Sequence, residues 1–449
     1  MNDKNEASVA APRQLLSVPD GIFLTVGMVI GVGIFKAPSV VAGNTSSAAE
    51  FLLAWLIGGA VSLCGALVYA ELSARHPETG GEYTFLSRAF GLDTAFLFAW
   101  SRMTVIQTGA IAAVAFVFGD YASEILRLGD YSSAIWAAIG VVALTALNLA
   151  GTLQTKTMQK VMEIALITAL VLLALGALMT GGSPKPAPAE ATNLSFGLAM
   201  IFVLFTYGGW NEAAYLAGEV RDARRNMIKI LVFGILAVTA LYMLVNIGYL
   251  AALGLGGMRE SKAVAADVMR LMVGDKGAVV LALIVCVSAL TTINAAIFTG
   301  ARTTWAFGRD FGLFSGLGNW RESGSTPANA LLLQGVVALV LVGAGSLTQD
   351  GFSAMVAYTA PVFWTFFLLT GITLFVLQAR GGEQPSIRAP FHPLVTLAFC
   401  AMCVYMLYSS VDYIRNPMFG PKFGNMVLAG IVVMAAGIPL YFLAARRGK

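Results

Sequence analysis

Twelve apolar segments of about 20 residues recur along the chain, separated by polar stretches. A helix of about 20 residues is long enough to cross the hydrocarbon core of a bilayer, because each residue adds about 1.5 Å along its axis. Only 12% of the residues are charged, against about 25% in soluble domains. We therefore predict an all-α membrane protein with twelve transmembrane helices, at residues 20–42, 50–74, 92–119, 133–151, 160–181, 194–218, 228–252, 278–300, 328–346, 352–378, 393–411 and 424–445.

Lysine and arginine are distributed unevenly between the two sides that these spans create. The termini and the loops after even-numbered spans hold 18 of the 28 Lys and Arg residues, and the other loops hold 8. Lys36 and Arg102 lie within spans. Because basic loops stay in the cytoplasm, we predict cytoplasmic termini and a multi-pass protein of the cell's inner (plasma) membrane. The bias also explains the net charge of +4, so we expect no nucleic-acid partner. The polar start of the chain predicts no signal peptide.

The order of the spans predicts an internal repeat. A polar, proline-rich linker at residues 182–192 separates a first group of five spans (20–181) from a second (193–380). An odd number of spans makes the second group enter from the opposite face, which gives an inverted-topology repeat. Residues 1–19 form a cytoplasmic segment, and 381–449 add two helices and a tail. We also predict a short cytoplasmic helix at Thr84–Gly91 and an external amphipathic helix at Ser261–Gly274, with Val264, Val268, Leu271 and Met272 on its apolar face.

Glycines interrupt the first span of each group. Gly31-Val32-Gly33 lies in the first span and Gly208-Gly209 in the sixth. Each glycine costs a helix interior up to about 1 kcal/mol relative to alanine. Interrupted helices at corresponding positions of two repeats mark the substrate site of many transporters, near the bilayer midplane. We therefore predict that both helices are broken and that they bracket one binding site.

The break in the first span has the chemistry to bind a zwitterion. If the chain unwinds at 31–33, N–H groups at the positive end of the next half-helix suit a carboxylate. Carbonyl groups near Val29 and Ile30, at the end of the preceding half-helix, suit an ammonium group. Pro38 weakens the helix further. The alternative is that Gly27 and Gly31 form a helix-packing face.

Aromatic residues flank the break in the sixth span. Phe205, Tyr207 and Trp210 surround Gly208 and Gly209, and carbonyl groups near Phe205 add acceptors for the same ammonium group. Phe205 or Tyr207 could cover a bound side chain as a gate. The alternative is that these rings belong to the core or anchor the helix at the interface.

Polar residues inside other spans suggest a coupling site. Arg102 and Glu163 lie in the third and fifth spans, and we predict that they pair, because an unpaired charge there costs about 3 kcal/mol or more. The pair is either structural or a site of proton coupling or cation replacement. The eighth span carries a polar cluster that is either an ion site or a hydrogen-bonded helix interface: Ser288, Thr291, Thr292 and Asn294.

Two other classes of function fit the sequence less well. All four cysteines lie inside apolar spans and both histidines lie in loops, so we expect no metal site, no cofactor and no enzyme active site. A channel is a second alternative, but its pore is usually built by subunit symmetry.

Several motifs resemble the amino acid–polyamine–organocation superfamily. They are Gly31-Val-Gly-Ile-Phe35, the stretch Tyr69–Tyr83 and Tyr207-Gly-Gly-Trp-Asn-Glu212 with Gly218-Glu219-Val220. Support extends to Ala301–Asp310 and Gly437–Tyr441. The Gly-Gly-Trp-Asn stretch is most similar to the L-type branch, which carries neutral amino acids.

This resemblance implies a five-plus-five fold with two extra C-terminal helices, and a secondary transporter that moves neutral L-amino acids by alternating access, as an exchanger or with protons. Sodium coupling or a cationic amino acid or polyamine substrate is the alternative within the fold. The expected partners are the substrate and the lipid bilayer, and the chain is expected to act as a monomer. The implied substrate-binding residues are Val29, Ile30, Gly31, Val32, Gly33, Ile34, Phe205, Thr206, Tyr207, Gly208 and Asn211, with Phe205 and Trp210 as gates.

Two positions depart from the family pattern. Val32 stands where the family often has a serine, which removes a hydroxyl group but keeps the backbone N–H. Leu166 stands where members often carry a lysine in the fifth span, whose ammonium group replaces a sodium ion. These departures bear on substrate affinity and on the coupling ion.

Overall fold

The computed structural model describes residues 16–76, 81–151, 156–180, 195–212, 220–321, 326–381, 390–415 and 420–447, and most of them are helical. The α-helices are α1 (Val18–Val29), α2 (Gly33–Gly43), α3 (Ala48–Arg75), α4 (Gly81–Phe90), α5 (Leu92–Ser101), α6 (Gln107–Ile125), α7 (Ser132–Leu149), α8 (Lys156–Thr180), α9 (Phe196–Thr206), α10 (Ala223–Glu260), α11 (Val264–Val273), α12 (Asp275–Asp310), α13 (Ala328–Ser346), α14 (Gly351–Ala379), α15 (Leu394–Arg415) and α16 (Gly420–Arg447). A π-helical turn, η1 (Arg102–Ile106), joins α5 to α6, and a 3-10 helix, η3 (Gly312–Gly318), follows α12.

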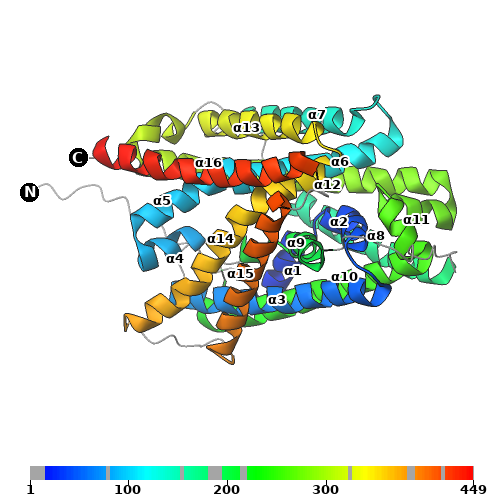
Figure 1. Ribbon diagram of the computed structural model, residues 1–449, viewed down its shortest axis with the longest axis horizontal. Coiled ribbons are helices and arrows are strands. Elements are labelled where there is room, and N and C mark those ends of the chain that lie inside the picture. Colours follow the sequence, from blue (N-terminus) through cyan, green and yellow to red (C-terminus); the bar gives the residue numbers. More distant parts are fainter. Residues whose placement is uncertain are drawn as a thin grey trace, which may run out of the picture.

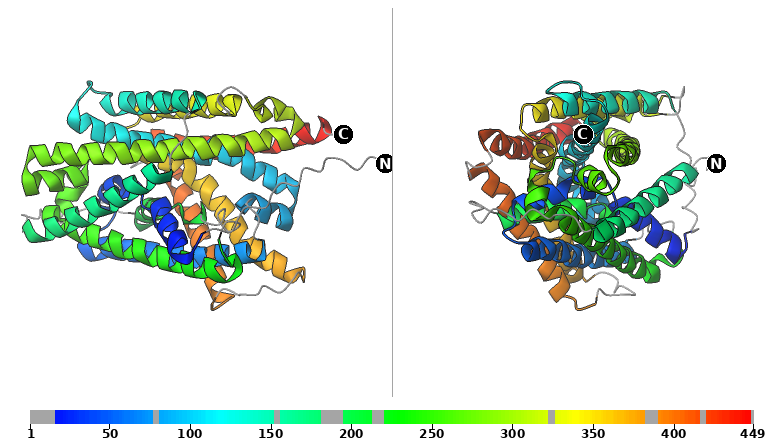
Figure 2. Two further views of the ribbon diagram at one scale, coloured as in Figure 1. Left: turned by 180° about the vertical axis from the view of Figure 1, so that it is seen from behind. Right: turned by 90° about the vertical axis from the view of Figure 1, so that its right-hand side faces the viewer.

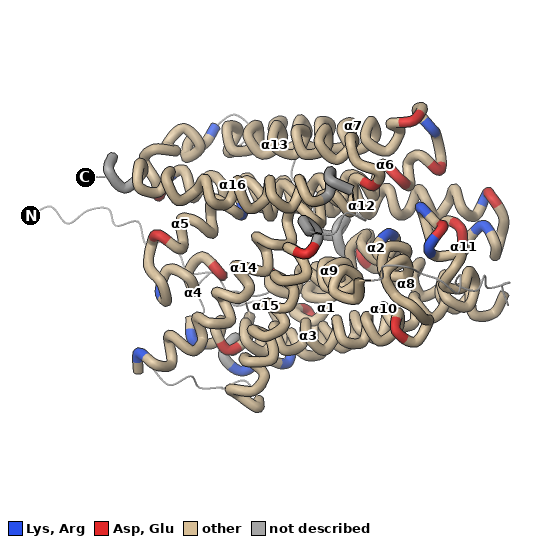
Figure 3. Tube along the Cα trace, in the orientation of Figure 1, with Lys and Arg blue, Asp and Glu red and all other residues tan. Residues whose placement is uncertain are grey.

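The predicted all-α membrane fold is confirmed. In the described residues, ten spans are long and apolar enough to cross a membrane, and α1 with α2 forms an eleventh that is bent by 53°. These eleven coincide with predicted spans. The sixth predicted span begins with the shorter apolar helix α9, and its residues 213–219 lie outside the described part of the chain. Charged residues gather toward the two ends of the helices, as Figure 3 shows.

Serine side chains define where three of the helices begin. Ser17 and Asp20 form a capping box at the start of α1, in which each side chain bonds to the backbone of the other residue. Ser47 accepts a hydrogen bond from the N–H of Glu50 at the start of α3, and Ser195 caps α9 in the same way. Such caps satisfy N–H groups that have no acceptor within the helix.

The long helices pack in two layers (Figures 1 and 2). The first layer holds α1, α2, α3, α9 and α10, and the second holds α6, α7, α12 and α13, with contacts between neighbouring helices in each. Spans at the same position in the two groups of five lie in contact: the first and sixth through α2 and α9, the second and seventh through α3 and α10, the third and eighth through α6 and α12, and the fourth and ninth through α7 and α13.

Two short helices lie at opposite ends of the molecule in Figure 1. The helix α4 coincides with the predicted cytoplasmic helix and leads into α5. The helix α11 coincides with the predicted external helix and contacts α2, α8 and α12. Val264 and Val268 of α11 are buried against the protein, whereas Leu271 is 56% exposed on its surface.

Candidate substrate site and neighbouring charges

The predicted break in the first span is present. The helix α1 ends at Val29 and α2 begins at Gly33. Between them the Gly31 N–H donates to the Val29 carbonyl oxygen over 2.8 Å, which turns the chain out of the helix. Val32 is the N-cap residue of α2, and its side chain makes no capping hydrogen bond. Because the first N–H groups of a helix lack acceptors within it and lie at the positive end of the dipole, the start of α2 suits an anion.

The backbone rather than the side chains offers this chemistry. A Cβ atom added at Gly31 would meet no atom within 4 Å, so the chain is open at this residue. One added at Gly33 would lie 3.1 Å from Thr206 Oγ1, so Gly33 allows α2 to approach α9 closely. The neighbouring side chains are at most 4% exposed: Val29, Ile30, Val32 and Ile34.

The sixth span is also broken, in a tighter geometry. The helix α9 ends at Thr206, and the Gly208 N–H then donates to the Phe205 carbonyl oxygen over 3.0 Å. Gly209 has a φ angle of +109°, which residues with a Cβ atom rarely adopt. A Cβ atom at this position would also overlap the carbonyl oxygen of Met28. The backbones of the two breaks are therefore in direct contact at Gly209.

The hydroxyl group of Tyr242, on α10, joins the two breaks. It lies 3.0 Å from the Val29 carbonyl oxygen and 3.1 Å from the Thr206 carbonyl oxygen, at the ends of α1 and α9. A hydroxyl group has one hydrogen, so it donates to one of these oxygens at a time. The Val29 oxygen, predicted to bind an ammonium group, also accepts from Gly31. Nothing in the sequence distinguishes Tyr242 from other tyrosines of the core, and only the fold brings it to the breaks.

Phe205 and Tyr207 lie on different sides of the sixth span. Phe205 is partly buried, and its ring packs edge-on against Phe352, with 5.8 Å between centroids. Tyr207 is fully buried, and its hydroxyl group donates to the Trp55 carbonyl oxygen over 3.1 Å. Of Phe205 and Tyr207, therefore, only Phe205 has a side chain that is partly exposed and makes no hydrogen bond to a neighbouring helix.

Trp210 packs among rings of three other helices. The distances between its ring centroid and those of its neighbours are 5.1 Å to Tyr69 on α3, 5.5 Å to Phe367 on α14 and 6.4 Å to Phe399 on α15. With Ser62 and other residues of these helices, Trp210 lines a small cavity on this side of α9. In this structure the indole of Trp210 therefore contacts α3, α14 and α15, and its gate role stays a prediction.

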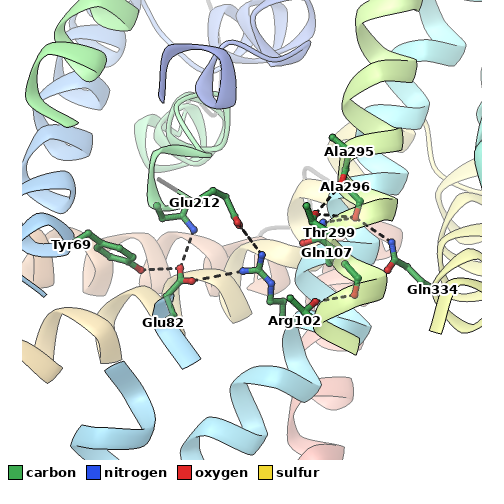
Figure 4. A network of polar contacts seen from close by, with 12 residues as sticks. Tyr69, Glu82, Arg102, Gln107, Glu212, Ala295, Ala296, Thr299 and Gln334 are labelled. Carbon is green, nitrogen blue, oxygen red and sulfur yellow. Dashed lines mark hydrogen bonds and ion pairs between the residues drawn. The ribbon is translucent and has the colours of Figure 1, made fainter. Parts of the chain in front are cut away.

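Charged residues cluster next to the second break (Figure 4). One terminal nitrogen of Arg102, in η1, lies 2.9 Å and 3.2 Å from the two carboxylate oxygens of Glu212. The other lies 3.8 Å from Glu82 on α4. Glu82 also accepts hydrogen bonds from the Tyr69 hydroxyl group, over 3.1 Å, and from the Asn211 amide, over 2.9 Å. Asn211, which the family resemblance implies as a substrate-binding residue, thus ties the break to α4.

Comparison with known protein families identifies the family to which this chain belongs. The family model described as amino acid permease matches residues 16–436. The chain belongs to this amino acid permease family. It is 28% identical over 456 residues to the b(0,+)-type amino acid transporter 1 of Rattus norvegicus, which covers 98% of this chain and 89% of the relative.

Two further relatives match most of this permease. The serine/threonine exchanger SteT of Bacillus subtilis (strain 168) is 25% identical over 432 residues, covering 94% of this chain and 95% of the relative. The large neutral amino acids transporter small subunit 2 of Homo sapiens is 27% identical over 440 residues, covering 94% of this chain and 78% of the relative. The permease is thus similar along nearly its whole length to proteins named as amino acid transporters and exchangers.

The structure gives Arg102 partners other than the predicted Glu163. The guanidinium group of Arg102 binds Glu212. The carboxylate of Glu163, on α8, packs against α1 instead, where a Cβ atom at Gly27 would lie 2.5 Å from Glu163 Cδ. The predicted pair was therefore wrong, because sequence separation does not show which helices face each other. Leu166 is buried on the same helix.

In the polar cluster of the eighth span, Asn294 bonds to a neighbouring helix, whereas the two threonines bond within their own helix. Thr291 and Thr292 donate to the carbonyl oxygens of Val287 and Ser288 in their own helix. Asn294 accepts a hydrogen bond from the Asn148 amide on α7. Of the two interpretations of this cluster, these contacts favour the hydrogen-bonded interface over the ion site.

A second group of charges lies on the other side of the breaks and was not predicted. The ammonium group of Lys36, on α2, lies 2.8 Å from an Asp120 carboxylate oxygen on α6 and 3.8 Å from one of Asp350. It also donates to the Lys262 carbonyl oxygen over 3.3 Å. A lysine inside an apolar span signals such a partner, but the sequence does not show that aspartates at the ends of two other helices converge on it.

Proposed function

We propose that this permease is a secondary transporter that carries neutral L-amino acids across the membrane by alternating access, either by exchange or with protons. The observation that carries the proposal is the uncapped start of α2, open at Gly31, next to the end of α1. N–H donors and carbonyl acceptors lie within one turn of each other there, and a free amino acid carries the matching carboxylate and ammonium groups. The names of the relatives support this substrate class.

The backbone at the first break recognises the part that all amino acids share. The carboxylate accepts from N–H groups at the start of α2, and the ammonium group donates to carbonyl oxygens at the ends of α1 and α9. When the ammonium group takes the Val29 oxygen, the Tyr242 hydroxyl group can donate to Thr206 instead. This exchange of acceptors leaves the hydroxyl hydrogen bonded in both states.

Alternating access follows from movement of the first layer of helices against the second. The two groups of five spans, at 20–181 and 193–380, form the inverted repeats, and 381–449 add two helices. Both termini face the cytoplasm of a cell whose plasma membrane holds the protein, which works as a monomer. The basic loops on the side of the termini support this orientation.

Reconstitution into liposomes tests the proposed function. A panel of radiolabelled amino acids is offered to liposomes with and without internal amino acid, sodium or a pH gradient. We expect saturable uptake of small or medium neutral L-amino acids that internal substrate accelerates or a pH gradient drives. Uptake that does not saturate and shows no counterflow would instead indicate a channel, and an absolute requirement for sodium would select the sodium-coupled alternative.

A further inference from the structure

The two carboxylates next to the second break differ in accessibility. The Glu82 side chain is 3% exposed and is held by Tyr69 and Asn211, whereas the Glu212 side chain is 39% exposed. Arg102, between them, is 8% exposed. Glu212 is therefore the member of this cluster that other molecules can reach.

Glu212 also lies close to the proposed substrate site. Its N–H donates to the Gly209 carbonyl oxygen over 3.0 Å, and Gly209 contacts α1 at Met28. Its neighbour Asn211 bonds to Glu82 on α4. Glu212 thus lies next to the second break and beside Arg102, near Glu82 of α4 (Figure 4).

An accessible carboxylate at this place attracts cations unless another group neutralises it. Both oxygens of Glu212 lie within hydrogen-bond distance of a single Arg102 nitrogen. Opposite charges at such a distance attract each other, although the attraction is weaker for an exposed carboxylate such as Glu212 than it is between two buried groups. Arg102 therefore occupies the oxygens of Glu212 and offsets one of the two negative charges that Glu82 and Glu212 bring to this cluster.

We propose that Arg102 is a specificity-determining residue: by neutralising Glu212 it keeps the route selective for neutral amino acids and excludes those with cationic side chains. This inference rests on the proposed function. It assigns Arg102 a role in discrimination, which depends on the difference between the affinities of two substrates rather than on either one alone.

The test compares uptake of L-lysine and L-alanine by purified variants in liposomes. Arg102→Gln removes the guanidinium group that pairs with the Glu212 carboxylate. The ratio of lysine to alanine uptake should therefore rise on the order of tenfold. The double variant Arg102→Gln with Glu212→Gln should return to the wild-type ratio. Arg270→Gln is the matched control, because it removes the same charge from ion pairs of α11 with Glu124, Asp267 and Asp275, and it should leave the ratio unchanged.

Glu212→Gln alone supplies a second test that does not depend on the stability of Arg102→Gln. It makes the cluster less negative, so the ratio of L-glutamate to L-alanine uptake should rise. The inference is overturned if Arg102→Gln takes up alanine with an unchanged lysine ratio, if the double variant keeps the raised ratio, or if Glu212→Gln shows no change. Failure of the wild type to take up any amino acid would refute the proposed function instead.

Discussion

The two breaks contain similar glycine motifs but use them differently. In the first span, an added Cβ atom at Gly31 would meet nothing, and the next helix begins without a capping side chain. In the sixth span, Gly209 has a φ angle of +109° and its backbone lies against Met28. The first break leaves room and hydrogen-bond donors for a ligand, whereas the second is closed by protein.

The two breaks therefore have different roles: the first binds the ligand, and the second holds the half-helices in place. The first break presents the donors that an amino acid carboxylate requires. The second break fixes the position of the first, because Gly209 touches Met28 and Tyr242 bonds at the ends of both half-helices. Substitutions at the second break should therefore damage the fold, and those at the first should damage binding.

The largest effect is expected at Gly209. Gly209→Ala places a Cβ atom on the Met28 carbonyl oxygen in a backbone conformation that disfavours alanine, so it should cost about 2–3 kcal/mol of stability and abolish uptake. Thermal unfolding in detergent and uptake in liposomes measure both effects. Gly343→Ala is the control, because a Cβ atom there meets nothing within 4 Å. If the Gly209→Ala variant were active and as stable as the wild type, the second break would not be needed to position the first.

Gly31→Ala should separate binding from stability. The added methyl group meets no protein atom, so the melting temperature should stay within a few degrees of the wild type. The same methyl group narrows the approach of a carboxylate to the start of α2, so KM for alanine should rise on the order of tenfold. Uptake kinetics and thermal unfolding, measured on one preparation, decide the point. An unchanged KM would place the carboxylate elsewhere.

Tyr242→Phe should have an intermediate effect, because it removes only the hydroxyl group shared by the two breaks. A net hydrogen bond contributes about 1 kcal/mol, so KM should change about fivefold while the ring keeps its packing. Tyr249→Phe is the matched control. Tyr249 is buried on the same helix, and its hydroxyl group has no hydrogen-bond partner among the described residues. Equal effects of the two substitutions would argue against a special role for Tyr242.

Val32→Ser should have the smallest effect. It adds a hydroxyl group beside the N–H donors of α2, where the family often has one, so KM should fall by no more than about fivefold. It also removes buried methyl groups, which should cost about 1 kcal/mol in thermal unfolding. Val32→Ala separates the two contributions, since it loses methyl groups without gaining a donor. A rise in KM for Val32→Ser would show that the hydroxyl group competes with the substrate.

The sequence predicted the fold better than the contacts within it. The apolar segments are long enough to cross the hydrocarbon core of a bilayer, so the spans could be located from the sequence. The broken first helix and α4 were located from the sequence as well. Pairings between distant residues could not, because they depend on which helix faces meet. Arg102 therefore received the wrong partner, and neither the aspartate partners of Lys36 nor the position of the Tyr242 hydroxyl group was predicted.

The site shows the same division between local and tertiary information. Glycine and proline report backbone conformation locally, so the first break was confirmed at 30–32. Side-chain direction has no such local signal. The rings around Trp210 and the hydrogen bond between Asn294 and Asn148 depend on which helix faces meet, so the sequence left the polar cluster open between an ion site and a helix interface.

The central claim is that the backbone at the first break binds the carboxylate and ammonium groups of a free amino acid. Competition against radiolabelled L-alanine uptake in liposomes tests it most directly, with L-alanine, L-alanine methyl ester and N-acetyl-L-alanine as competitors. The account predicts strong inhibition by L-alanine and loss of most inhibition when either group is blocked. Equal inhibition by the methyl ester would contradict it, because that compound has no carboxylate for the start of α2 to bind.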